Sequence, residues 1–136
     1  MNLTVSQAQG RVPVTIIRIQ GDLDGSNYRD LIAKGQQLHT SGARDILLDL
    51  SDVPYMSSAG LVALHSLVLL ARGEKPAHPA SGWEALSAVA REQSVAPQQH
   101  VKLLNPQPRV DQVLATTGFD VFFEIHTNEA AAVASF

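Results

Sequence analysis

The chain lacks several features that would point to particular classes of protein. It contains no cysteine, which excludes disulfides, thiolate catalysis and thiolate metal sites. It has no block of lysine and arginine, and its formal net charge is −3. Nucleic acid is therefore not an expected partner, because phosphate binding needs clustered cations. The longest apolar run, residues 61–71, is too short to span a bilayer, and residues 1–14 do not resemble a signal peptide. We expect a cytoplasmic protein without membrane insertion.

Motifs for cofactors and metals are also missing. The sequence has neither G-x-x-x-x-G-K-[ST] nor G-x-G-x-x-G, and its five histidines show no HExxH or i, i+4 pairing, so we expect no cofactor. Four acidic residues could converge at one edge of a sheet, namely Asp22, Asp24, Asp49 and Asp52. Because no loop has calcium-ligand spacing, we interpret them as turn residues at the surface rather than a metal site.

Strand and helix patterns alternate along the chain. Strands are predicted at 12–19, 45–50, 101–104 and 121–125, with a weaker edge strand at 2–8. Helices are predicted after Ser26 or Asn27, after Ser58, after an Asn105 N-cap with Pro106 as the first helical residue, and over 128–136. Residues 73–100 are polar and rich in proline and glycine, with a capping box that predicts a short helix at 81–93. The sequence predicts one α/β domain over residues 1–136, with four main helices and a short inserted helix on a small, mostly parallel mixed sheet.

Residues 46–72 contain the most informative stretch. The strand lacks polar alternation, as expected for an interior parallel strand, and the helix after it is apolar nearly all round, so it should be buried. The turn between them reads Ser57-Ser58-Ala59-Gly60. One of these serines can act simply as the N-cap, or a hydroxyl at this helix N-terminus can accept a phosphate, which the helix dipole and free N–H groups would stabilise. A hydrolase using Ser58 is a third interpretation, but the turn lacks the first glycine of a nucleophile elbow and no motif supplies a base.

Three stretches together resemble the STAS domain, and within it the bacterial anti-sigma factor antagonists. They are residues 21–24 (GDLD), 46–53 (ILLDLSDV) and 55–61 (YMSSAGL). The resemblance resumes at 101–105 and 114–119, and it covers nearly the whole chain except 73–100. It implies a STAS-like fold in which helices pack on a small mixed sheet.

The resemblance also implies a role in partner switching rather than catalysis. An antagonist of this type binds an anti-sigma factor, typically a serine kinase, and so frees the sigma factor. The kinase abolishes this binding by phosphorylating a serine at the helix N-terminus, and a serine phosphatase restores it. The phospho-acceptor of the family motif D-S-[ST]-G aligns with Ser58, its glycine with Gly60, and an acidic neighbour of the site with Asp24. The expected partner-binding residues are Asp24, Ser57, Ser58, Gly60, Leu61 and Val62.

Two residues depart from the family motif. Ser57 stands where the motif has aspartate, and Ala59 stands where it has serine or threonine. The first change removes a negative charge and leaves Ser57 as a competing acceptor. Together with the insertion at 73–100, these changes support an alternative in which the protein is a non-phosphorylated STAS subunit of a transporter or a signalling assembly.

Overall fold

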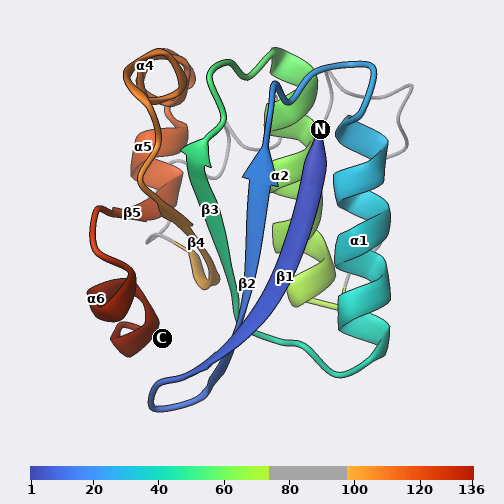
Figure 1. The fold of residues 1–136 in the computed structure, drawn as a ribbon, viewed down its shortest axis with the longest axis vertical. Coiled ribbons are helices and arrows are strands. Elements are labelled where there is room, and N and C mark those ends of the chain that lie inside the picture. Colours follow the sequence, from blue (N-terminus) through green and yellow to red (C-terminus); the bar gives the residue numbers. More distant parts are fainter. Residues whose placement is uncertain (74–97) are drawn as a thin grey trace.

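The protein forms a five-stranded sheet with helices on both faces (Figure 1). The structure is a computed structural model, and it describes residues 1–73 and 98–136. The strand order is β1-β2-β3-β4-β5; β1 is antiparallel to β2 and the other neighbours are parallel. The predicted mixed, mostly parallel sheet is confirmed. The strands are β1 Asn2–Gln9, β2 Pro13–Gln20, β3 Ile46–Asp52, β4 Gln98–Leu104 and β5 Phe123–His126. The helices are α1 Tyr28–Thr40, α2 Ser58–Ala71, α4 Pro108–Thr117, α5 Phe119–Phe122 and α6 Glu129–Ala134.

The central strands carry apolar side chains on both faces. Four consecutive residues of β2, Val14 to Ile17, are buried, which breaks the alternation of the strand: Val14 and Ile16 belong to one core, and Ile17 belongs to the core on the other face of the sheet. β3 lies between β2 and β4 and is parallel to both, as its unbroken apolar run predicts. The parallel strands therefore end at a common edge, from which the chain continues into α1, α2 and α4 (Figure 1).

The larger core lies between one face of the sheet and the helices α1, α2, α4 and α5. α2 is its centre, because every residue from Gly60 to Val68 is buried. α1 and α2 pack closely at Gly35, where any added Cβ would collide with the end of the Leu67 side chain. Burial of a full leucine or valine side chain stabilises a fold by about 1.5–3 kcal/mol, so α2 is fixed firmly in place.

The second face is covered by α6 and is held by a buried lysine. The Lys102 side chain is only 4% exposed, and its Nζ donates to the carbonyl and hydroxyl oxygens of Ser135, each at 2.9 Å. Nζ also lies 3.2 Å from Oε2 of Glu124, and Glu124 Oε1 lies 2.6 Å from Nε2 of His126. Burial disfavours the charged form of Glu124, but hydrogen bonds from Lys102 and His126 outweigh burial and lower its pKa.

The predicted start of the third helix is wrong by two residues. α4 begins at Pro108, with Gln107 as the N-cap, and not at Pro106. Asn105 instead adopts a left-handed conformation (φ 53°), and its N–H donates to the carbonyl of His126. A proline does occupy the first helical position, but the sequence offers two candidates, and tertiary contact selects the second. Gly118 ends the helix at φ 81°, a left-handed conformation that glycine adopts without strain.

Two strand boundaries and one cap also differ from the sequence prediction. β5 begins at Phe123, because Val121 lies in the one-turn helix α5 and is 56% exposed. β4 begins at Gln98, inside the segment interpreted as an insertion. Asn27 precedes α1 but makes no side-chain cap bond. Asn128 caps α6, and its side chain accepts from the N–H of Ala131. The short helix predicted at 81–93 lies outside the described residues.

Candidate functional site

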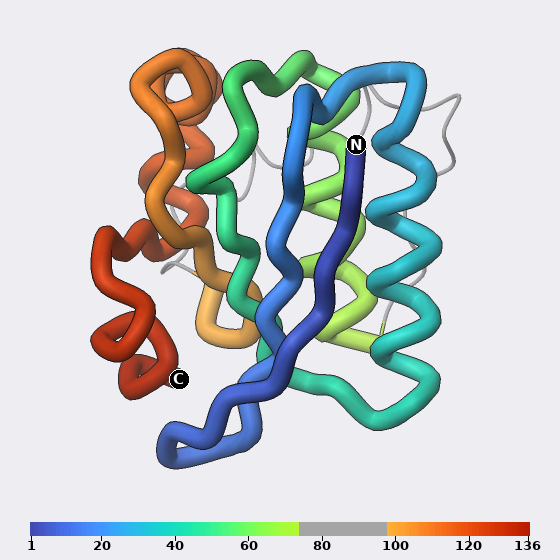
Figure 2. The backbone as a smooth tube through the Cα atoms, in the orientation of Figure 1, coloured from blue at the N-terminus to red at the C-terminus, as the bar shows by residue number. Residues whose placement is uncertain are grey.

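The serine turn lies at the carboxyl edge of the parallel strands, where β3 leads into α2. α2 begins at Ser58, and Ser57 is its N-cap residue. The loop that joins β2 to α1 lies at the same edge, and both loops are at the top of the view in Figure 2. Two segments far apart in sequence, 21–27 and 53–58, are therefore neighbours in space.

Main-chain hydrogen bonds hold the two loops together. The N–H of Leu23 donates to the carbonyl of Tyr55, and the N–H of Ser57 donates to the carbonyl of Leu23, both at 3.0 Å. Leu23 and Met56 form a parallel bridge between these bonds. Asp24 follows Leu23 directly, so the loop that carries Asp24 is bonded through its backbone to the loop that carries the serine turn. A role for Asp24 beside the phospho-acceptor stays a prediction.

Asp24 is an ionised residue in a well-ordered turn. Its Oδ1 accepts hydrogen bonds from the hydroxyl of Ser26 at 2.6 Å and from the N–H of Ser26 at 2.9 Å. These two bonds lower the pKa of Asp24, because they favour its charged form. The N–H of Asp24 donates to the side chain of Asn27 at 3.0 Å, and the Asn27 amide donates to the carbonyl of Asp22 at 2.8 Å. Asn27 thus orders this acidic turn and does not cap α1.

The two serines differ in accessibility. Ser58 is exposed at the first position of α2. The Ser57 hydroxyl is buried, makes no N-cap bond and has no hydrogen-bond partner among the described residues. The first turn of α2 has no acidic residue, unlike those of α1, α4 and α6. Of the two candidate acceptors, Ser58 is therefore the exposed residue, and it stands at a helix N-terminus whose first turn carries no acidic side chain.

The other residues predicted at the contact surface are internal. Leu61 is 1% exposed and Val62 is 4% exposed, and both belong to the main core. Gly60 is also buried, and a Cβ added there would lie 2.5 Å from Cγ of Met56 and 3.2 Å from the Leu23 carbonyl oxygen. Gly60 permits the close approach of α2 to the two loops. We therefore assign Gly60, Leu61 and Val62 to packing and leave them out of the contact surface.

Two other acidic residues near this edge, Asp49 and Asp52, are held by other side chains. Oδ1 of Asp49 accepts from the hydroxyl of Ser51 at 2.6 Å, and Asp52 forms an ion pair with Arg18 at 2.6 Å. Within residues 1–73 and 98–136, no three histidine, aspartate or glutamate residues are grouped so that they could hold a metal ion. In the same two ranges, no helix has the length and apolar character needed to cross a membrane.

A further pair of side chains at this edge was not predicted from the sequence. Tyr55, in the loop before α2, is 39% exposed. The guanidinium carbon of Arg109, near the start of α4, lies 5.5 Å from the centroid of the Tyr55 ring. The start of α4 is held against the end of β3 by Gln107, whose amide donates to the carbonyl of Ser51 at 2.8 Å. No sequence motif joins these residues, because only the fold brings α4 to the serine loop.

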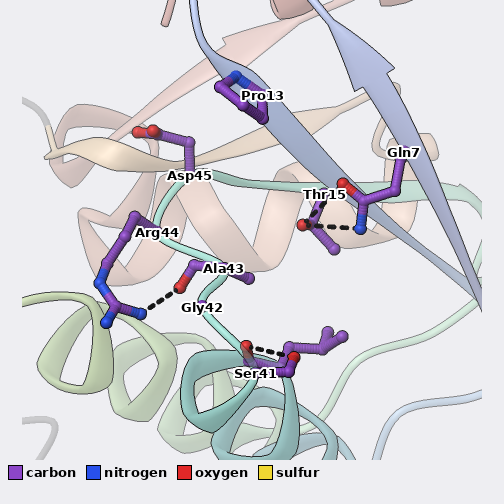
Figure 3. Close-up of a pocket in the computed structure, with 9 residues that line it drawn as sticks. Gln7, Pro13, Thr15, Ser41, Gly42, Ala43, Arg44 and Asp45 are labelled. Atoms are coloured by element: carbon purple, nitrogen blue, oxygen red, sulfur yellow. Dashed lines mark hydrogen bonds between the residues drawn. The ribbon is translucent and has the colours of Figure 1, made fainter.

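A pocket on the opposite edge does not contribute to this site (Figure 3). It lies where β2 and β3 begin and includes the end of α1. Its polar groups bond mainly to one another: Gln7 to Thr15 at 3.2 Å, and Arg44 to the carbonyl of Ala43 at 2.9 Å. The serine turn and this pocket are separated by the length of the strands.

Comparison with known families identifies the fold around this site. A family model described as "Mlab, STAS domain" matches residues 6–77, more than half of the 136-residue chain. The chain belongs to the STAS domain family. The match includes the acidic turn at Asp24, the strand β3, the serine turn and the whole of α2.

Solved structures similar to this STAS domain are anti-sigma factor antagonists. A Thermotoga maritima protein assigned to that class is 18% identical, with a TM-score of 0.69 over 96% of this chain and 90% of that one. An anti-sigma factor antagonist from Mycobacterium paratuberculosis is 16% identical, with a TM-score of 0.65 over 98% and 92%. Unphosphorylated SpoIIAA, called a Bacillus cell fate determinant, is 23% identical, with a TM-score of 0.58 over 96% and 93%, and its phosphorylated form has also been solved. At these identities, the comparison establishes a shared fold.

Proposed function

We propose that this STAS protein is an anti-sigma factor antagonist that binds a serine-kinase anti-sigma factor and is released when Ser58 is phosphorylated. The observation that carries the proposal is one exposed serine, Ser58, at the N-terminus of a buried helix, in a loop that is bonded through its backbone to the loop of Asp24. The similarity to antagonist structures, one of them solved with and without phosphate, supports the same function. A serine phosphatase would reset the protein.

Phosphate at Ser58 would act through charge. It adds about −1.5 to −2 charges at neutral pH, at an edge of the sheet that also carries the ionised Asp24. The free N–H groups at the start of α2 favour the modified state within the domain. α2 is buried along most of its length and cannot shift easily. A partner that packs against neutral Ser58 would instead meet a strongly negative, hydrated group, and binding would be lost.

Mass spectrometry after incubation with the cognate kinase and ATP tests this function. We expect one phosphate on the wild-type protein, none on Ser58→Ala, and one on Ser57→Ala, because the Ser57 hydroxyl is buried. Ser57→Ala serves as the matched control, since it removes a hydroxyl one residue away. Phosphate that persists on Ser58→Ala would contradict the assignment, and so would unchanged kinase binding by the phosphorylated protein.

A second candidate function is a non-phosphorylated STAS subunit of a transporter or a signalling assembly. The observation that favours it is Ser57, which replaces the aspartate that the family motif places before the acceptor. Purification of the protein with its native partners separates the two candidates. Transporter ATPase subunits would support the second function, and a serine-kinase anti-sigma factor would support the first.

A further inference from the structure

We propose that Tyr55 and Arg109 form a second contact point for the protein partner and that this point receives a carboxylate of the partner. The inference rests on the proposed function, because it concerns the same partner and the same edge of the sheet. It adds a contact outside the serine turn and the acidic turn, and it specifies the chemistry of the partner group.

Both residues are placed on firmly held backbone. The carbonyl of Tyr55 accepts from Leu23, and the flanking residues Val53 and Met56 are 0% and 1% exposed. Gln107, two residues before Arg109, binds the end of β3, and its own carbonyl accepts from the N–H of Asp111 at 2.8 Å. The exposed Tyr55 ring is therefore presented on a rigid loop, which limits the entropy lost when a partner binds.

The position of Arg109 is unfavourable for the helix that carries it. It is the second residue of α4, where the helix dipole favours anions over cations. A residue that opposes the local electrostatic preference often serves a functional role. Tyrosine and arginine are also the side chains that most often dominate binding energy at protein interfaces.

The contact between Tyr55 and Arg109 leaves N–H groups of the guanidinium available to a carboxylate. The guanidinium carbon of Arg109 lies 5.5 Å from the centroid of the Tyr55 ring, and this cation–π contact leaves N–H donors of the guanidinium able to bind both oxygens of one carboxylate. No carboxylate of the described residues forms an ion pair with Arg109, whereas Arg18 on β2 is already paired with Asp52. Asp22 and Asp24 at the same edge would repel a polyanion, so an acidic side chain of a protein fits better than nucleic acid or a lipid surface.

Binding measurements with the purified serine-kinase anti-sigma factor, the one used in the Ser58 test, examine this contact. We expect Tyr55→Ala and Arg109→Ala each to weaken binding of the unphosphorylated protein by about tenfold or more, as for interface hot spots. Arg109→Lys should recover only part of the affinity, because an ammonium cannot make the paired bonds. Arg109→Ala should also reduce the salt dependence of binding. Arg11→Ala, which removes an exposed charge from the opposite edge, is the control and should leave affinity unchanged.

The outcomes separate this inference from the proposed function. Suppose that the wild-type protein binds the kinase and that Tyr55→Ala and Arg109→Ala, both shown to be folded by circular dichroism, bind it with the same affinity. This result would overturn the second contact and leave the Ser58 switch intact. Failure of the wild-type protein to bind the kinase at all would overturn both. An Arg109→Glu variant whose binding is restored by reversing one acidic residue of the kinase would identify the paired carboxylate.

Discussion

Replacing Ser57 by alanine should leave the protein at least as stable as the wild type, although serine is normally among the best N-cap residues. A serine N-cap usually accepts a hydrogen bond from the second or third N–H of its helix, and its loss costs about 0.5–2 kcal/mol. Ser57 makes no such bond, and its hydroxyl is buried without a partner among the described residues. The usual reason for the cost is therefore absent.

The size of the effect follows from the hydrogen bonds to water that the Ser57 hydroxyl loses on folding. A buried polar group left unsatisfied costs about 1–3 kcal/mol relative to water. Removing the hydroxyl eliminates this cost, but the cavity left by one oxygen atom destabilises the folded protein and offsets part of the gain. We expect Ser57→Ala to change the free energy of unfolding by between 0 and about +1 kcal/mol. The midpoint of thermal unfolding would then rise by up to about 4 °C for a domain of this size.

Urea unfolding followed by circular dichroism measures this change, and Asn128→Ala provides the comparison. Asn128 is also an N-cap residue, and its side chain does accept from the N–H of Ala131 at 2.9 Å. Its replacement should cost about 0.5–1 kcal/mol, somewhat less than a typical cap because α6 is short and near the end of the described chain. A loss of 1 kcal/mol or more in Ser57→Ala, about the usual effect, would refute the structural argument.

Two further predictions concern packing and pH. Gly60→Ala should destabilise the protein by about 1 kcal/mol. Crowding of the added Cβ against Met56 and Leu23 costs about 1–3 kcal/mol, and the higher helix propensity of alanine offsets about 1 kcal/mol of this. Gly25→Ala is the control and should leave the free energy of unfolding unchanged in the same urea assay, because its Cβ would meet open space. The lowered pKa of Glu124 means that its stabilising contribution is present above its ordinary pKa of about 4.3 and is lost as the pH falls through the lower folded value. The free energy of unfolding should therefore fall from pH 6 to pH 3, measured by urea titration at each pH, and Glu124→Gln should flatten that fall. A stabilised Gly60→Ala variant, or an unchanged pH profile in Glu124→Gln, would contradict these explanations.

Much of the fold could be predicted because hydrophobic patterning is a local signal. The unbroken run in β3 and the almost wholly apolar α2 each predicted burial, and both lie in the interior. Boundaries were predicted less well, because tertiary contacts select among local signals of similar strength. Pro106 and Pro108 both fit the first position of a helix, and the bond from Asn105 to His126 is a long-range contact that no local pattern contains.

The candidate site, too, could be predicted from the sequence only in part. The serine turn and Asp24 could be found because they form recognisable short motifs. The difference between Ser57 and Ser58 could not, since it depends on which of two adjacent hydroxyls faces the interior. The burial of Leu61 and Val62 agrees with the apolar pattern of α2, whereas their prediction as contact residues came from the resemblance to the family and not from that pattern.

The bridge between Leu23 and Met56 has a consequence for how such proteins diversify. The loop that carries Asp24 and the loop that carries the serine turn are joined by backbone groups, and the hydrogen bonds from Leu23 and Ser57 do not depend on side-chain identity. The exposed side chains at positions 55 and 58 can therefore be exchanged while the backbone bonds between the loops are kept. Single substitutions at these two positions would therefore change what this surface contacts without altering the bonds between the loops. Several proteins with the same loop backbone could in this way bind different partners in one cell.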